Sequence, residues 1–478
     1  MIILIVILSL VAALIILMLV RAALFTPKAQ SFPAPEKVEF DGEKAVSALQ
    51  TLIRYKTISY VDPAKEDDAE FENFTSALPA LFPNVYANSA PIRLPGRALL
   101  YKIAGKSDKK PTVLMAHYDV VPVNEEEWDK PAFDGIIEDG VMWGRGTIDT
   151  KVTFSGILFA SDTLLAKGFI PENDVYLAFS GGEEVSGPGA NHIIDWFIDH
   201  NVEPALVLDE GGGVVSNVFP GVKAPCAMIG TAEKGMMNAS FTVKSAGGHA
   251  SSPKPHTPVG ILSKACVKVE NHPFPMHMTR PVKEMLDTLG RNAPFALRIV
   301  FANLWLFQGL LDFAMKKVGG EINALLRTTV AFTQAEGSQA PNVIPPIAKM
   351  TANLRLNPED TSAKAKKRLE KVIGEPSVTV DIWNVTEPSP ISETNCEPWN
   401  RVACAVSETW DGCLVSPYLM MACSDSRHYS RLSNHVYRFS AMALSKEERA
   451  SIHGNNEKLP VETVKRAAEF FIRFMKKC

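Results

Sequence analysis

Residues 174–187 read "DVYLAFSGGEEVSG", an apolar run followed by two glycines and two adjacent glutamates, Glu183 and Glu184. The run indicates a buried strand, and Gly181 and Gly182 are typical of the turn that ends a strand. Acidic residues are also favoured in the first turn of a helix, because the helix dipole is positive there. This stretch alone therefore predicts a strand, a turn and the start of a helix.

The surrounding hundred residues repeat this arrangement. The segments "PTVLMAH" (111–117) and "ALVLD" (205–209) indicate strands, while "TKVTFSGILFASDTLLAKGF" (150–169) and "GANHIIDWFIDHN" (189–201) have helical periodicity. Strands that alternate with helices are typical of an open sheet with helices on both faces. The pattern predicts a doubly wound α/β catalytic domain.

The pattern changes near residue 236, where "MNASFTVKSA" (237–246) alternates like an antiparallel strand, as "AKMTANLRLNP" (348–358) does again. Between them, "FALRIVFANLWLFQGLLDFAM" (295–315) carries Arg298 and Asp312, which favours a packed amphipathic helix over a membrane span. We therefore expect an N-terminal anchor or signal over 1–24, a linker over 25–40, a catalytic domain over 41–235 and 357–478, and an inserted α+β lid or dimerisation-type domain over 236–356.

The first twenty residues, "MIILIVILSLVAALIILMLV", contain no charge and are long enough to cross a bilayer as a helix. The apolar core of a cleaved signal is usually shorter, about 7–15 residues, so an uncleaved anchor is favoured over a cleaved signal. Arg21 and Lys28 follow the span and favour a cytosolic domain. Sequons at Asn73, Asn238 and Asn384 favour the opposite side of the membrane.

The net charge and the cysteine content bear on the possible partners and on the state of the thiols. The formal net charge of -4 gives no electrostatic reason to expect a nucleic-acid partner. The seven cysteines lack the paired spacing of a zinc ribbon, and they leave buried thiols and disulfides equally open.

Histidines and carboxylates stand where strands are expected to end or a helix to begin. They are His117, Asp119, Asp149, Glu183, Glu184, Asp209, Glu210 and His453. Ligands bind beyond the carboxyl ends of strands in open α/β sheets, and so many like charges cannot be desolvated together without a cation. Mixed imidazole and carboxylate donors suit zinc, and their number fits two metals that share a bridging carboxylate.

Eight short motifs strengthen this interpretation. In chain order they are "HYDVVP", "GRGTIDTK", "SGGEEVSG", "LDEGG", "GGHASSP", "NVIPP", "SDSRHY" and "IHGNNE". The set resembles the co-catalytic zinc aminoacylase and carboxypeptidase family from about residue 45 to the end. It is most similar to the branch that holds the Gly-Xaa carboxypeptidases (carboxypeptidase S) and the N-fatty-acyl-amino-acid synthase/hydrolases.

The resemblance implies a role for each residue. Two zinc ions per chain would be bound by His117, Asp149, Glu184, Asp209 and His453, with Asp149 as the bridge. The family uses either acid at the "LDEGG" position, and Asp209 is chosen here over Glu210. Asp119 would hold the imidazole of His117, and Glu183 would serve as the general base.

Residues of the inserted domain are expected to bind the substrate. By the same resemblance, His249 would stabilise the tetrahedral oxyanion, sometimes in a partner subunit's site. Asn342, Arg355 and Arg427 are candidates to hold a substrate carboxylate, and the planar fork of arginine suits that task. Just before the aspartate of "SDSRHY", Cys423-Ser424 stands where many relatives have Gly-Thr or Thr, which leaves substrate detail open.

These expectations define a zinc-dependent hydrolase that cleaves the amide bond next to a free amino-acid carboxylate, with the reverse condensation also open to it. The alternatives are a zinc aminopeptidase or dipeptidase, or an inactive binding protein on the same fold. The expected partners are a small-molecule substrate, a membrane through the N-terminal segment, and a second copy in a homodimer. The resemblance and the sequons together place the catalytic domain in a lumen or the extracellular space.

Overall fold

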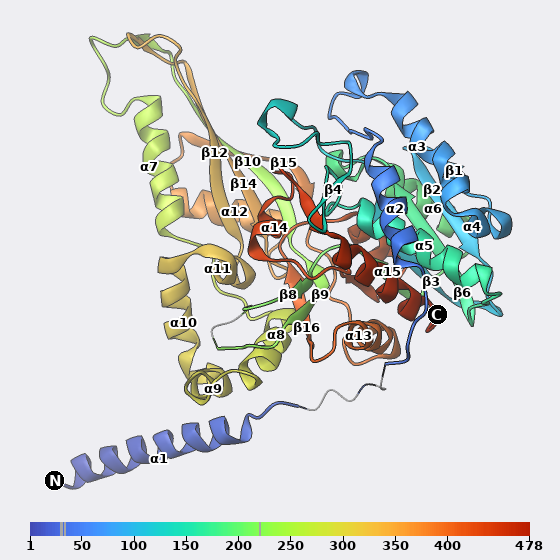
Figure 1. The fold of residues 1–478 in the computed structure, drawn as a ribbon. Helices are drawn as coiled ribbons and strands as arrows, with labels where there is room; N and C mark the ends of the chain where they lie inside the picture. The colour runs from blue at the N-terminus through green and yellow to red at the C-terminus, as the bar shows by residue number, and fades with distance from the viewer. Residues whose placement is uncertain (29–31, 33–34, 219–220) are drawn as a thin grey trace.

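The computed structural model describes residues 1–28, 32, 35–218 and 221–478, and Figure 1 shows its ribbon. A nine-stranded mixed sheet forms the centre, with its main path in the order β1-β2-β6-β3-β7-β17-β9-β16 and β8 paired to β9. Its strands are β1 (Ile92–Leu94), β2 (Ala98–Ile103), β3 (Ser107–His117), β6 (Asn173–Ser180), β7 (Leu206–Asp209), β8 (Gly213–Val215), β9 (Cys226–Glu233), β16 (Leu414–Met420) and β17 (Val436–Arg438).

The middle of this sheet is parallel. β3 runs parallel to both β6 and β7, and in this register His117 lies opposite Ser180. Because parallel strands end at the same edge, the residues that follow β3, β6 and β7 are brought together there. Side chains on both faces of β6 are buried, which explains its continuous apolar run.

Helices cover both faces of the sheet, as the sequence predicts. They are α2 (Gly42–Ile53), α3 (Asp68–Leu81), α4 (Pro83–Asn88), α5 (Lys151–Ala166), α6 (Gly189–Asp199), α13 (Glu397–Thr409) and α15 (Val461–Met475). The short helix α14 (Lys446–Ala450) has no buried residue. One face packs against α2, α5, α13 and α15, and the other against α6. A small three-stranded sheet of β4 (Ile136–Glu138), β5 (Val141–Trp143) and β18 (Lys458–Pro460) lies beside them.

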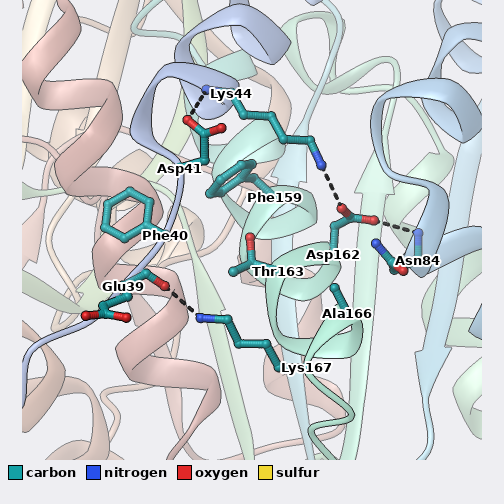
Figure 2. Close-up of a pocket in the computed structure, with 10 residues that line it drawn as sticks. All are labelled: Glu39, Phe40, Asp41, Lys44, Asn84, Phe159, Asp162, Thr163, Ala166 and Lys167. Atoms are coloured by element: carbon teal, nitrogen blue, oxygen red, sulfur yellow. Dashed lines mark hydrogen bonds and ion pairs between the residues drawn. The ribbon is translucent and has the colours of Figure 1, made fainter.

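The beginning of the catalytic domain is fastened to α5. Figure 2 shows the shallow pocket at this contact, where Lys44 pairs with Asp162 at 3.2 Å and Lys167 donates to the carbonyl oxygen of Glu39. The residues lining this pocket include none of the expected catalytic or metal-binding residues. Its polar contacts therefore hold the end of the linker in place on the core.

The inserted domain is larger than expected. Its sheet has the order β12-β14-β10-β15, with β10 (Gly235–Lys244), β12 (Thr329–Glu336), β14 (Ile347–Leu356) and β15 (Val378–Thr386). The expected boundary at residue 356 is therefore too early, because β15 pairs antiparallel with β10. The helices α7 (Pro258–Asn271) and α12 (Ser362–Ile373) share the core of this sheet. Residues 357–386, expected in the catalytic domain, therefore belong with α12 and β15 to the small domain, and the catalytic sheet resumes at β16.

A helical part of the insertion packs elsewhere. It comprises α8 (Arg280–Arg291), α9 (Phe295–Ala302), α10 (Leu304–Val318) and α11 (Gly320–Leu326). α8 and α11 share a hydrophobic cluster with β9 and β16, so this part covers the edge of the catalytic sheet. The expectation of a single packed helix over 295–315 is wrong. The segment forms two helices, interrupted at Asn303, and the axes of α9 and α10 differ by 100°.

The chain begins with α1 (Ile2–Leu24), which Figure 1 shows as a separate helix projecting from the rest of the molecule. By length and composition α1 is able to cross a membrane, and no residue of its apolar window is buried. All seven cysteines are free thiols, so the structure favours the thiol alternative over disulfides.

Candidate metal centre

Two histidines and an aspartate form the centre of the site. His117 ends β3, Asp149 lies two residues before the start of α5, and His453 lies in the loop between α14 and β18. The Nε2 atom of His117 is 3.0 Å from Oδ1 of Asp149, and Nε2 of His453 is 3.0 Å from its Oδ2. Asp149 therefore faces one imidazole with each carboxylate oxygen, the geometry of a bridging ligand.

Each half of this arrangement has a further carboxylate. On one side, Oε1 of Glu210 lies 3.2 Å from Nε2 of His117. On the other, Oε2 of Glu184 lies 3.0 Å from Nε2 of His453. Donor atoms of His117, Asp149 and Glu184 fall within 4.8 Å of one another, as do those of His117, Glu183 and Glu210. These are two overlapping sets of ligand atoms that share His117.

The structure favours Glu210 over Asp209, reversing the choice made from sequence. Asp209 is the last residue of β7 and is buried, and its Oδ2 accepts a hydrogen bond from the backbone N–H of Ser426. Successive side chains of an extended chain point in opposite directions, so only one of the two acids can face His117. Asp209 instead anchors the segment that carries Ser426.

Asp119 connects the histidine to the two glutamates. Its Oδ1 accepts a hydrogen bond from the backbone N–H of Glu183 at 3.1 Å, and its Oδ2 accepts one from that of Glu184 at 3.2 Å. Ser59 donates a third hydrogen bond to the same carboxylate. The Nδ1 atom of His117 lies 3.0 Å from the backbone carbonyl oxygen of Asp119, which leaves Nε2 free for the centre. Asp119 thus fixes both the ring and the turn that follows β6.

The charges of the site are mutually unfavourable without a cation. Burial, reinforced by neighbouring carboxylates, raises the pKa of Glu183 well above its ordinary value, and it also raises the pKa values of Glu184 and Glu210. Hydrogen bonds from both histidines outweigh burial and lower the pKa of Asp149. Hydrogen bonds to Asp149 and Glu184 raise the pKa of His453 to about 10. A bound cation would favour the ionised carboxylates and lower these raised pKa values.

Two acids that sequence analysis did not assign a role support the site. Asp425 follows β16 at the same edge of the sheet; its Oδ2 accepts a hydrogen bond from Ser180, and its Oδ1 is buried without a partner among the described residues. Glu457 accepts hydrogen bonds from the backbone N–H groups of Gly146, Ile148 and Asp149. Asp425 lies in the motif "SDSRHY" and Glu457 in the motif "IHGNNE". The sequence feature that could have identified Asp425 is an acidic residue shortly after the end of a strand.

Replacing Glu457 with alanine is expected to lower the free energy of unfolding by about 3–5 kcal/mol, because Arg145 would keep its charge in the core without a counterion. The two side chains are buried and their ion pair measures 2.6 Å. Denaturant unfolding monitored by circular dichroism measures the effect. Glu172→Ala is the matched control, since Glu172 forms a surface pair with Lys106 and should cost less than about 1 kcal/mol. Similar small losses in both variants would contradict the expectation.

The expected substrate-binding residues are split between two places. His249, on β11 (Gly248–His249), and Asn342, beside β13 (Val343–Ile344), are exposed neighbours, with the backbone N–H of Ala250 donating to the carbonyl oxygen of Asn342. They follow the far end of β10, which Figure 1 shows reaching away from the catalytic sheet. Ten extended residues span roughly 33 Å, so the chain's own centre is out of their reach.

Arg355 and Arg427 lie at the near end. Arg355 pairs with Met236, near the start of β10 in its antiparallel register with β14. The Nη1 atom of Arg355 lies 3.8 Å from the sulfur of Cys423. Arg427 donates from Nη1 to the carbonyl oxygen of Ser424, and its Nε is buried without a partner among the described residues. Both arginines therefore flank the segment that carries Asp425.

The fold and the cluster define a hydrolase of the metal-dependent α/β type with an inserted small domain. Residues 113–477 match the model of peptidase family M20/M25/M40, and the chain belongs to this family. It is therefore a peptidase or amidohydrolase, and its α/β architecture with a catalytic domain and a lid is that of the family.

Relatives and solved structures agree with this assignment. The chain is 33% identical to the N-fatty-acyl-amino acid synthase/hydrolase PM20D1 of Xenopus tropicalis, covering 92% of this chain and 87% of that protein. It is also 33% identical to the probable carboxypeptidase S-like 2 of Dictyostelium discoideum, covering 90% and 84%. An M20 metallo-carboxypeptidase from Sulfolobus solfataricus has the same fold, with a TM-score of 0.67 at 17% identity over 90% of this chain and 98% of that one.

Proposed function

We propose that the protein is a two-zinc hydrolase that cleaves the amide bond beside a free amino-acid carboxylate in N-acyl amino acids or short peptides. The observation that carries the proposal is the placement of Asp149 between His117 and His453, at 3.0 Å from each. The names of the relatives, synthase/hydrolase and carboxypeptidase, support this substrate class and the reverse condensation.

The donor set fits zinc. His117 and Glu210 would bind one ion, Glu184 and His453 the other, and Asp149 would bridge them. Imidazole and carboxylate are ordinary zinc ligands, and Oε1 of Glu184 is buried without a hydrogen-bond partner among the described residues. A crystal structure of a Bacillus subtilis peptidase described as dinuclear and metal-binding shares the fold, with a TM-score of 0.54. Bound zinc supplies Lewis acidity to the water and to the scissile carbonyl.

The chain's own residues would do the remaining work. Glu183 would accept a proton from the attacking water and deliver it to the leaving amine, while Asp119 holds its backbone in position. Arg355 and Arg427 would bind the substrate carboxylate, because each presents guanidinium nitrogens that no carboxylate engages among the described residues.

His249 and Asn342 would act in the site of a second copy. Their distance from the centre of their own chain and their exposure both support an active homodimer. A dimer in which each small domain reaches the partner's centre would bring His249 there as an oxyanion donor.

The N-terminal helix α1 would serve as a membrane anchor. It is 23 residues long, or about 35 Å at 1.5 Å per residue, enough for a hydrocarbon core of about 30 Å. We place the catalytic domain on the lumenal or extracellular side, as the sequons favour. Protease added to sealed vesicles or intact cells tests the orientation, and cleavage from the cytosolic side would contradict it.

A substrate profile of the zinc-loaded protein tests the function. We expect turnover of N-acyl amino acids and Gly-Xaa dipeptides, and a large loss when the substrate carboxylate is converted to an amide. Activity that needs a free amine and tolerates the amide would favour an aminopeptidase or dipeptidase instead. Absence of turnover with two zinc ions bound would favour a binding protein.

A further inference from the structure

The outer side of α9 and α10 is an apolar surface without a partner among the described residues. Its exposed side chains are Phe295, Trp305, Leu306, Leu310, Phe313 and Val318. Leu310 is 64% and Phe313 58% exposed, and no residue of α10 is fully buried. Single exposed apolar residues are normal, but six on two consecutive helices indicate an interaction surface.

The spacing shows that α10 has two different apolar sides. Leu304, Leu311 and Met315 are partly buried against the cluster that covers the edge of the catalytic sheet. Leu306, Leu310 and Phe313 follow one another at intervals of four and three residues, so they form a second stripe that faces outward. Packing within the chain therefore accounts for the first stripe and not for the second.

The C-terminal end of α1, the proposed membrane anchor, contacts the same helices. Arg21, in the last turn of α1, donates from Nε and Nη2 to the carbonyl oxygen of Ala302, which ends α9. Asn303, at the break between α9 and α10, donates to the carbonyl oxygen of Met18. Lys28 pairs with Asp287 of α8 at 2.9 Å. Figure 1 shows α9 beside the end of α1, with α10 leading away from it.

These contacts fix the level of α9 and α10 relative to a bilayer. If residues 2–20 of α1 fill the hydrocarbon core, Arg21 lies at its boundary, because a charged side chain is stable at the interface and not inside. The carbonyl oxygen that Arg21 binds must then lie there too. Trp305, the second residue of α10, lies three residues after Ala302 and is 52% exposed, and tryptophan is enriched at this depth.

The ends of the surface are also typical of an interfacial helix. Lys316 and Lys317 occupy the last turn of α10, and the ammonium of Lys317 lies 4.6 Å from the ring centre of Phe313. Lysines at the edge of an apolar stripe extend their charge to the headgroups and leave their stems along the apolar side. We propose that α9 and α10 form a second membrane contact, with Trp305, Leu310 and Phe313 in the boundary between headgroups and acyl chains. This inference rests on the proposed role of α1 as an anchor.

Fluorescence quenching of the full chain in vesicles of brominated phosphatidylcholine tests the contact. The chain has seven tryptophans and none in α1, so quenching by lipid reports on the rest of the molecule. We expect lipid-dependent quenching in the natural sequence and its loss in Trp305→Phe. Trp383→Phe is the matched control, since Trp383 is 43% exposed on β15 of the small domain and should leave the quenching unchanged.

A second pair of variants covers the stripe itself. Leu310→Asp and Phe313→Asp place a charge at exposed positions, so we expect folded protein with normal zinc content and several-fold less quenching of Trp305. Ile170→Asp, at a 58% exposed residue just before β6, should have no effect. Equal quenching in Trp305→Phe and the natural sequence would overturn the contact, as would chemical cross-linking of one α10 to another with no quenching by lipid.

Flotation after a carbonate wash separates the contact from the anchor. A chain that floats with the vesicles while Trp305 stays unquenched retains the anchor and overturns the second contact. A chain that fails to float overturns the anchor, and in that case quenching of Trp305 before the wash would support the contact by itself.

Discussion

Glu183→Gln is expected to reduce turnover by about 10²–10⁴-fold while zinc content stays at two per chain. Glutamine keeps the shape of the side chain but cannot accept a proton from water. The backbone N–H of Glu183 remains bound to Asp119, so the turn itself should not move. Metal analysis and steady-state kinetics on the same preparation measure the two quantities.

Glu184→Gln is the matched comparison, since the two residues are adjacent and their backbones share one anchor in Asp119. The side chain of Glu184 reaches His453 at 3.0 Å, on the side away from Glu210. A neutral amide is a poorer zinc ligand than a carboxylate, so this variant should lose metal and regain part of its activity in excess zinc. Loss of zinc in both variants, or near-normal rates in Glu183→Gln, would refute the division of roles.

His249→Ala is expected to reduce turnover by about 10²–10³-fold, the usual cost of removing an oxyanion donor. The decisive measurement is the mixture of two inactive variants. In a heterodimer of Glu183→Gln with His249→Ala, the His249→Ala subunit retains its own base and receives His249 from its partner. Half of randomly paired dimers are mixed and each has one intact site, so about a quarter of the natural activity should return.

The control for this mixture is the same pair at concentrations at which sedimentation shows only monomers. Activity should then be absent, because neither chain has a complete site. Failure to recover activity in a verified heterodimer would show that His249 acts within its own chain or not at all.

The sequence by itself determined the parts of the protein that depend on local pattern. The alternation around 111–210 predicts the doubly wound sheet, and parallel pairing of β3, β6 and β7 then brings residues after His117, Ser180 and Asp209 to one edge. The eight motifs predict the family, and the family model over 113–477 confirms it. Strand ends and motif order are local properties of the chain, so they predict the sheet and the family without information on long-range contacts.

Only the tertiary structure decided which of two adjacent acids faces the metal centre and which strands pair with each other. The sequence does not distinguish Asp209 from Glu210. In the structure the backbone N–H of Ser426 donates a hydrogen bond to Asp209, and Glu210 faces His117. The segment 378–386 has the pattern of any strand, and its pairing with β10 assigns it to the small domain. His249 and Asn342 come together because β11 pairs with β13, yet they lie beyond the reach of their own centre. Local pattern specifies which side chains are polar or apolar, whereas register and packing over long separations decide what each one faces.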